Sequence, residues 1–256
     1  MLNYPNIDPI IFSIGPLQLR WYGLSYVCGL LVAFKYLDHD FKVRLKLNSD
    51  QVLSVMTSII VGVLVGGRLG YIFFYDLLFY LDNPVEMLAF WHGGMSYHGA
   101  AIGAMCGMLY SAKKFKLSPF KLLDLLGIGS CIGIGFGRIA NFINGELYGR
   151  VTDSFFGMVF PRGGDLPRHP SQLYEAFLEG FVLFLILHIV KTKCDVKDGV
   201  LFVLYLIGYG FFRFVLEFFR QPDAQLGTLF MGFSMGQLLC VVMISLGAGL
   251  YQVVRR

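Results

Sequence analysis

Long apolar stretches alternate with short polar stretches along the whole chain. Seven of the apolar stretches have about the 20 residues that a helix needs to cross a bilayer. We predict spans at 19–37, 52–74, 95–112, 122–143, 172–190, 200–219 and 229–254. The pattern therefore predicts an all-α, polytopic integral membrane protein with seven transmembrane helices, folded as a single transmembrane domain over residues 1–256.

The segments outside these spans are mostly short, and two of them have a pattern of their own. The longest loop, 145–171, contains a β-prone stretch at 154–160 and a turn-rich run at 161–167, so we expect it to form a small external cap. The first seventeen residues are apolar and rich in proline, and we expect them to lie along the outer interface. Because no basic region precedes it, the first apolar stretch is expected to be retained as a span.

Glycines recur at every fourth position in three consecutive predicted helices. Such glycine ladders let helix backbones approach closely in a membrane, so we expect tight helix packing along all three. The alternative is that glycine is simply common in transmembrane helices. The three ladders are Gly62, Gly66 and Gly70, then Gly99, Gly103 and Gly107, then Gly129, Gly133 and Gly137.

Composition and charge support a membrane protein. Of the 256 residues, 56% are hydrophobic and 15% are charged, which is too apolar for an ordinary soluble domain. The net charge is +4, but the basic residues fall in short clusters between the apolar stretches and not on one face. We therefore expect membrane lipids as partners and no nucleic acid.

The distribution of basic residues predicts the orientation of the chain. Loops after the first, third and fifth spans and the C-terminus carry most of the lysines, which mark the cytoplasmic side. These residues are Lys42, Arg44, Lys46, Lys113, Lys114, Lys116, Lys121, Lys191, Lys193, Lys197, Arg255 and Arg256. The N-terminus is then outside and the C-terminus cytoplasmic.

The cysteines give no sign of a metal or redox site. Their number is odd, and none lies within ligand or redox spacing of another, so we expect inert thiols and predict neither a metal nor a cofactor. They are Cys28, Cys106, Cys131, Cys194 and Cys240.

Ionisable residues inside the predicted spans are functional candidates, because they are costly in lipid. In the predicted orientation seven of them belong to the outer half of the bilayer, where a site would reach a lipid headgroup. These are Arg68, His98, Arg138, Glu175, Glu179, Arg213 and Glu217. Asp124 and His188 fall near the inner ends of helices, where a solvated or capping role is the simpler interpretation.

Five polar motifs, in order along the chain, resemble those of the prolipoprotein diacylglyceryl transferases. The densest is Arg138-Ile139-Ala140-Asn141-Phe142-Ile143-Asn144-Gly145-Glu146-Leu147-Tyr148-Gly149. The others are Arg20-Trp21-Tyr22-Gly23, His92 to Gly99, Leu166 to Glu175 and Arg213 to Asp223. Small departures occur at Tyr97, where the family often has Phe, and at Ala100, where a further Gly is common.

The resemblance implies an enzyme of the bacterial cytoplasmic (inner) membrane and a specific reaction. Phosphatidylglycerol would donate its diacylglyceryl group to the lipobox cysteine of a preprolipoprotein signal peptide, which leaves glycerol phosphate and a thioether. The resemblance implies His98, Arg138 and Arg213 as catalytic residues. It implies substrate-binding roles for Tyr22, Asn141, Glu146, Gly149 and Glu217.

The chemistry of this reaction fits the types of residue present. A thiol with a pKa of about 8.5 is mostly protonated near neutrality, so it needs a base or a cationic setting. The departing phosphate gains negative charge, which arginine binds through planar paired donors. Arg138 and Arg213 suit the phosphate, Glu146 and Glu217 could orient or balance them, and His98 could accept the proton.

Each candidate also has a purely structural interpretation. Arg213 and Glu217 are spaced for an ion pair on one helix, and Arg138 could extend to the outer interface. His98 could be a hydrogen-bonded packing residue, Tyr22 could belong to the aromatic belt, and Asn141 with Asn144 could satisfy the helix end. Arg68, Tyr174 and Tyr209 have a suitable depth but no assigned role.

Two other function classes remain as alternatives. A transporter or channel could use the outer arginines to admit an anion, but the sequence has no internal repeat and no evident charge at the midplane. A seven-helix receptor is supported by the number of helices alone.

Overall fold

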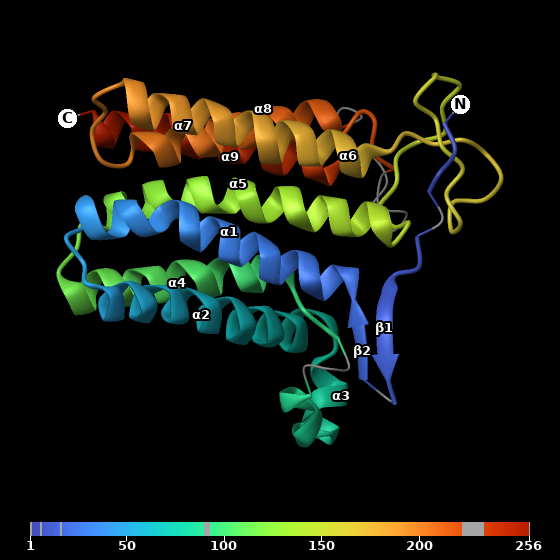
Figure 1. Cartoon of the computed structure of the whole chain (residues 1–256), viewed down its shortest axis with the longest axis horizontal. Coiled ribbons are helices and arrows are strands. Elements are labelled where there is room, and N and C mark those ends of the chain that lie inside the picture. Colours follow the sequence, from blue (N-terminus) through green and yellow to red (C-terminus); the bar gives the residue numbers. More distant parts are fainter. Residues whose placement is uncertain (1, 6, 16, 90–92, 222–232, 256) are drawn as a thin grey trace. The chain divides into compact units, whose positions relative to one another are not determined.

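The computed structural model describes residues 2–5, 7–15, 17–89, 93–221 and 233–255. The helices are α1 (Trp21–Val43), α2 (Ser49–Tyr75), α3 (Leu77–Asp82), α4 (Tyr97–Phe115), α5 (Pro119–Ile143), α6 (Ser171–Glu175), α7 (Leu183–Lys193), α8 (Val200–Leu216) and α9 (Met235–Val254). A 3-10 helix, η1 (Pro84–Leu88), precedes α4, and a π-helix, η3 (Ala176–Val182), joins α6 to α7. Figure 1 shows these elements on the chain.

Each of the seven predicted spans contains a long helical segment. Among the described residues, four segments are long and apolar enough to cross a membrane: α2, α5, the continuous helix Ser171–Lys193 and α9, with α8 shorter but apolar. The seventh predicted span begins at residue 229, which lies outside the described residues, and α9 begins at Met235. The chain is therefore mostly helical, as the hydrophobic pattern predicts.

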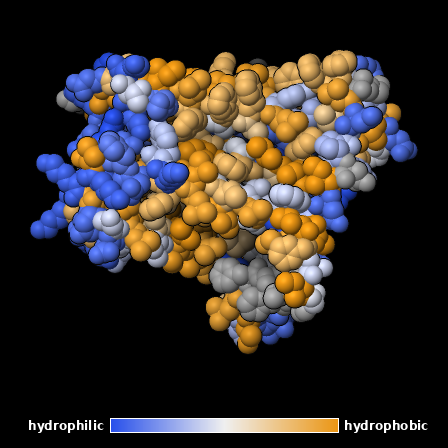
Figure 2. All heavy atoms as spheres, in the orientation of Figure 1, coloured by the Kyte–Doolittle hydropathy of each residue, from blue (hydrophilic) through white to orange (hydrophobic). Residues whose placement is uncertain are grey.

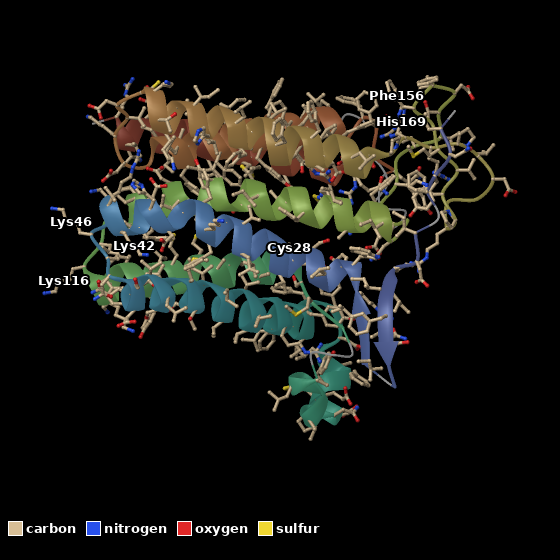
Figure 3. All side chains as sticks on the ribbon, viewed as in Figure 1. Cys28, Lys42, Lys46, Lys116, Phe156 and His169 are labelled. Carbon is tan, nitrogen blue, oxygen red and sulfur yellow. The ribbon has the colours of Figure 1, made fainter. Side chains whose placement is uncertain are left out.

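The helices divide into two compact units. Unit 1 comprises Met1–Leu37 and Asp124–Arg256, and unit 2 comprises Asp38–Leu123. Figure 2 shows apolar side chains along the helices and hydrophilic side chains gathered at helix ends. Within unit 2, Lys42, Lys46 and Lys116 lie at the same end of the helices (Figure 3).

In unit 2, α2 and α4 pack through their glycines. A Cβ atom on Gly70 would lie 2.8 Å from Gly99 Cα, and one on Gly103 would lie 3.0 Å from Gly66 Cα. Only glycine allows so close an approach of two backbones. The packing predicted for the first two glycine ladders is therefore confirmed.

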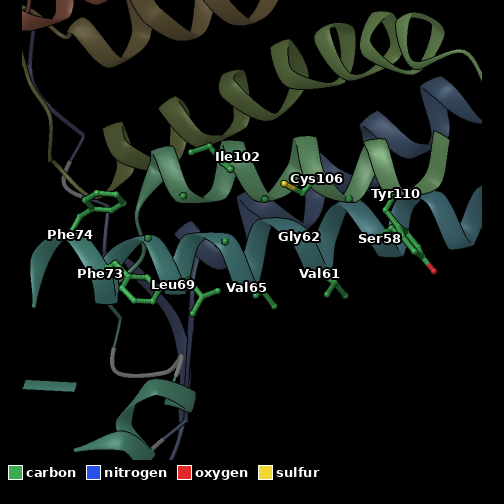
Figure 4. A pocket seen from close by; sticks show the side chains of 15 residues that line it. Ser58, Val61, Gly62, Val65, Leu69, Phe73, Phe74, Ile102, Cys106 and Tyr110 are labelled. Carbon is green, nitrogen blue, oxygen red and sulfur yellow. The ribbon is translucent and has the colours of Figure 1, made fainter. Parts of the chain in front are cut away.

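An open apolar groove of about 600 Å³ runs along this helix pair (Figure 4). The glycines lie between the larger side chains that line it. Those larger side chains include Val61, Val65 and Leu69 from α2 and Ile102, Cys106 and Tyr110 from α4.

The third glycine ladder, on α5, does not pack in this way. No atom lies within 4 Å of a Cβ built on Gly133, so the expected tight contact there is wrong. Instead, a Cβ on Gly180 of η3 would lie 2.7 Å from Gly135 Cα. The spacing of glycines defines a stripe on a helix, but it does not say which face meets a neighbour, and here η3 meets the roughly opposite face of α5, which carries Gly135.

The N-terminal segment forms a hairpin that the sequence analysis did not predict. Strands β1 (Ile10–Ile14) and β2 (Leu17–Arg20) pair antiparallel, with Ser13 opposite Gln18 and an irregularity between Ile10 and Phe12. Gly15 has a φ of 57°, which suits the tight connection. The sequence signal for this hairpin is the alternation of apolar and polar residues on either side of Gly15.

The loop 145–171 packs on a small core at the end of α5. Phe142, Met158 and Phe160 are its buried residues, and the Tyr4 hydroxyl donates to Phe142 O at 2.8 Å. Burial raises the pKa of Tyr4 above its usual value, so the phenol keeps the proton that it donates. In the predicted β-prone stretch only Met158 makes a bridge, with Arg168, and the described loop contains no strand.

Candidate functional site

Four charged side chains from three helical elements of unit 1 form a continuous row. Arg138 Nε on α5 lies 2.8 Å from Glu175 Oε2 on α6, and the same oxygen lies 3.4 Å from Arg213 Nη1 on α8. Arg213 Nη2 in turn lies 2.9 Å from Glu217 Oε2. The structure thus brings together both predicted arginines and Glu217, and it adds Glu175 between the arginines.

Local sequence places these groups at the ends of their helices. Arg213 lies in the last turn of α8, and Glu217 follows one turn later, which is the spacing of a helical ion pair. Glu175 ends α6, directly before the π-helical turn of η3. The ion pair that the spacing of Arg213 and Glu217 predicted is therefore present, and it extends into a larger cluster.

The cluster is buried and densely charged. Glu175 is 0% exposed and Arg213 is 9% exposed, whereas 19% of the Arg138 side chain remains accessible. Buried charges persist when opposite charges compensate them. The closest approach of Arg138 to Glu175 is through Nε, so its terminal Nη atoms lie farther from that carboxylate.

A second buried carboxyl group lies one helical turn from Glu175. Glu179 is 0% exposed, and its carboxyl oxygens have no hydrogen bond to a described residue. It is within electrostatic range of Glu175, Arg213 and Arg138. It belongs to η3, and π-helical turns of this kind are frequent at functional sites.

The end of the densest motif forms an amide–carboxylate network. Asn141 Nδ2 and Asn144 Nδ2 both donate to Glu146 Oε1, at 2.9 and 3.2 Å. Gln172 Nε2 donates to the Glu146 backbone carbonyl at 2.6 Å. The ion-pair partner of Arg138 is Glu175. Glu175, and not Glu146, therefore balances the charge of Arg138.

Gly149 lies where two backbone segments meet. Its N–H donates to His169 O at 2.8 Å, and it forms a bridge with Arg220. A Cβ there would lie 2.7 Å from His169 Cβ, so no larger residue fits without a shift. This packing alone accounts for a glycine at the end of the motif.

Tyr22 lies in the first turn of α1 beside a second tyrosine. The two hydroxyl oxygens of Tyr22 and Tyr26 are 3.1 Å apart, and their rings are 5.0 Å apart. Tyr26 is within electrostatic range of Arg138 and Glu146. Sequence reasoning missed Tyr26, although its position one turn after Tyr22 was the available signal.

Two predicted residues lie in unit 2. His98 is in the first turn of α4, but its side chain lies outside the described residues. Arg68 is buried and donates to the backbone carbonyls of Glu86, Met87, Ala89, Gly93 and Gly94. These bonds give Arg68 a role that the sequence could not assign, because they hold the segment that leads into α4.

Other polar candidates have local roles. Asp124 accepts from Gly199 N and Phe202 N, both at 2.8 Å, so it caps α8 from α5, and the predicted capping role is confirmed. Tyr174 contacts His169, with 3.3 Å between its hydroxyl and Nδ1. Tyr209 stacks on Tyr205 and is within electrostatic range of both arginines of the cluster.

Within the described part of the chain, no group of three His, Cys, Asp or Glu side chains is placed to share a metal ion. The chemistry available at the cluster is that of two guanidinium groups, one of them partly accessible. Such groups bind phosphate or carboxylate through paired donors.

Comparisons with known proteins show the family of this chain. The family model described as prolipoprotein diacylglyceryl transferase matches residues 9–253. The phosphatidylglycerol–prolipoprotein diacylglyceryl transferase of Geobacter sulfurreducens is 48% identical over 256 residues, covering 100% of this chain and 98% of the relative. The enzymes of the same name from Photobacterium profundum and Rickettsia conorii are 48% and 44% identical, covering 96% of this chain and 93% and 96% of their own lengths. The chain therefore belongs to the prolipoprotein diacylglyceryl transferase family.

Proposed function

We propose that this protein transfers the diacylglyceryl group of phosphatidylglycerol to the lipobox cysteine thiol of a preprolipoprotein at the outer leaflet of the bacterial cytoplasmic membrane. Membership of the family and the names of the full-length relatives support this activity. A new bond forms between the thiol sulfur and the glyceryl carbon. The bond from that carbon to the phosphate oxygen breaks, and its electron pair leaves with glycerol phosphate.

The observation that carries the proposal is the meeting of Arg138 and Arg213 on one oxygen of Glu175. Two guanidinium groups held this close can share a phosphate, whose charge grows by one as the phosphodiester becomes a phosphomonoester. Arg138 is the more accessible, and its terminal nitrogens are the donors that we assign to the phosphate. Glu175 and Glu217 offset the arginine charge inside the membrane.

The remaining predicted residues have supporting roles in this proposal. We propose that His98 accepts the thiol proton, as a neutral imidazole can. Asn141, with Glu146, and Tyr22, beside Tyr26, would contact the headgroup from the ends of α5 and α1. Gly149 contributes by letting two backbone segments meet at the edge of the site.

The orientation follows from the charges at the helix ends. We propose seven spans in a single domain, the N-terminus outside, the C-terminus cytoplasmic and the loop 145–171 as an external cap. In unit 1, Lys197 Nζ donates to Arg255 O at 2.8 Å, so two of the basic segments lie together, as cytoplasmic segments are expected to do.

The partners follow from the reaction. They are phosphatidylglycerol, the signal peptide of a preprolipoprotein with its lipobox cysteine, and the surrounding membrane lipids. We propose no cofactor, because the phosphate is the leaving group and the thiol is the nucleophile. We propose no nucleic-acid partner, because the basic residues fall in short clusters between the apolar stretches and not on one face.

The test is transfer by the purified protein in detergent. Phosphatidylglycerol and a lipobox peptide are incubated with the enzyme, and the peptide mass is followed by mass spectrometry. We expect the peptide to gain one diacylglyceryl group, and a peptide with serine in place of cysteine to gain none. If the cysteine peptide gains no mass in several detergents while the protein remains folded, the proposal is wrong.

A further inference from the structure

The first turn of α9 lies against the cluster of charges, at a place to which the reaction assigns no residue. Ser234 is the N-cap of α9, and its hydroxyl oxygen accepts from Gln237 N at 3.2 Å. The same hydroxyl donates to Glu217 Oε1 at 3.0 Å. Ser234 is 5% exposed, so its hydroxyl makes both bonds away from water.

The two oxygens of Glu217 therefore have different partners. Oε1 accepts from Ser234, and Oε2 lies 2.9 Å from Arg213 Nη2. Rotation of this carboxylate would break the hydrogen bond from Ser234 and separate the ion pair with Arg213. The orientation of Arg213 thus depends on the position of Ser234.

Gly236 provides a second, independent contact between α9 and Glu217. A Cβ atom on Gly236 would lie 2.8 Å from Glu217 Oε1 and 2.9 Å from its Cδ. The carboxylate consequently rests directly on the first turn of α9, where the helix dipole and the free N–H groups favour negative charge. Phe233, just before the cap, contacts Phe214 of α8 with ring centroids 5.8 Å apart.

We propose that Ser234 and Gly236 are positioning residues for the phosphate site. The N-terminus of α9 fixes Glu217, and Glu217 orients Arg213. This inference rests on the proposed function only for its readout, the transfer reaction. Neither residue touches the substrate in this scheme, because both act through the carboxylate.

Two substitutions separate positioning from helix capping. Gly236→Ala leaves the Ser234 cap in place, and alanine is compatible with a helix, but its Cβ displaces the Glu217 carboxylate. Ser234→Ala removes the cap and the bond to Glu217 together, and Ser234→Thr restores the hydroxyl. Gly249→Ala is the matched control, because it lies on the same helix with no atom within 4 Å of its added Cβ.

The experiment measures kcat and KM for phosphatidylglycerol and for a lipobox peptide, together with the thermal midpoint in detergent. We expect Gly236→Ala to keep its thermal midpoint and to lose about tenfold in kcat/KM for the lipid, the scale of one charge-assisted bond. KM for the peptide should be unchanged. Ser234→Ala should show the same loss, Ser234→Thr should recover most of it, and Gly249→Ala should match the wild type.

The outcomes distinguish this inference from the proposed function. An inactive wild-type protein would overturn the proposed function. An active wild type with Gly236→Ala and Ser234→Ala equally active would overturn the positioning role alone. A third outcome is that Ser234→Ala loses kcat/KM only in proportion to its lower thermal midpoint while Gly236→Ala is fully active. Ser234 would then be only a helix cap, and the positioning role would again be overturned.

Discussion

Arg138 and Glu175 form an ion pair of 2.8 Å between α5 and α6, and the same oxygen, Glu175 Oε2, also lies 3.4 Å from Arg213 Nη1. One buried carboxylate therefore serves two arginines. Without it, two like charges would face each other in a region of low dielectric, where their repulsion is strong.

Glu175→Gln should consequently cost both stability and activity. Removing one partner from a buried pair destabilises a protein by about 3–5 kcal/mol, and here Arg138 loses its ion-pair partner while Arg213 keeps Glu217. We expect a lower thermal midpoint in detergent and loss of most transferase activity.

Glu179→Gln is the matched comparison, since the two residues lie on consecutive turns and are both fully buried. Glu175 forms ion pairs with Arg138 and Arg213, whereas Glu179 lies within electrostatic range of the same arginines, so that three glutamates, 175, 179 and 217, face these two arginines. Neutralising it should leave the thermal midpoint unchanged or raise it. A variant as unstable as Glu175→Gln would show that the Glu179 charge is needed.

The packing of α2 on α4 gives a test that needs no substrate. Gly103→Leu should prevent accumulation of folded protein, because a side chain there would meet the backbone of Gly62 and Gly66. Gly133→Leu should accumulate normally, because its Cβ would have no neighbour within 4 Å. Thermal midpoints and yields of the two variants decide the matter, and equal damage would contradict the assignment of the packing face.

The sequence specifies the helices of this protein better than the contacts between them. Apolar runs of spanning length are a local property, so the positions of the seven helical segments could be predicted. The pairing of Arg138 with Glu175 depends on which helix faces meet, and no local pattern contains that information. Glu175 could be identified as an ionisable residue inside a predicted span, but the role of arginine partner was considered for Glu146 and Glu217.

Smaller elements were missed for related reasons. The hairpin at Ile10–Arg20 has strands too short to stand out beside the proline-rich start of the chain. Ser234 and Gln237 have the spacing of a capping box, which is a local signal, but only the fold places that cap on Glu217. Motif reasoning could identify the arginines, and geometry was needed to find what holds them.

The burial of His169 predicts how stability depends on pH at the end of unit 1 that carries the loop 145–171 (Figure 3). Burial lowers its pKa below the usual 6.5, because the charged imidazole loses solvation. The unfolded chain then binds the proton more readily than the folded protein does. The contribution of neutral His169 to the free energy of unfolding is therefore complete above pH 6.5, and it is lost as the pH falls through 6.5 towards the pKa of the folded protein. Thermal midpoints between pH 7.5 and 5.5 should fall less in His169→Phe, which keeps the ring contact with Phe219. Parallel curves for the two proteins would count against this role.

The arginines themselves provide the most direct test of the phosphate site. Arg138 approaches Glu175 through Nε, which leaves its two terminal nitrogens for a second anion. Lysine has a single ammonium group, so Arg138→Lys can pair with Glu175 or with the phosphate, but not with both in the same geometry. We expect the variant to stay folded, because the positive charge beside Glu175 is kept, and to lose about a hundredfold in kcat/KM for phosphatidylglycerol, the scale of one or two charge-assisted hydrogen bonds.

Arg213→Lys should lose activity in the same way, because it too must contact both Glu217 and the phosphate. Binding of phosphatidylglycerol, measured by native mass spectrometry, should weaken in parallel with activity. Near wild-type turnover in Arg138→Lys would show that a positive charge alone is sufficient there, and would assign the paired contact with phosphate to Arg213.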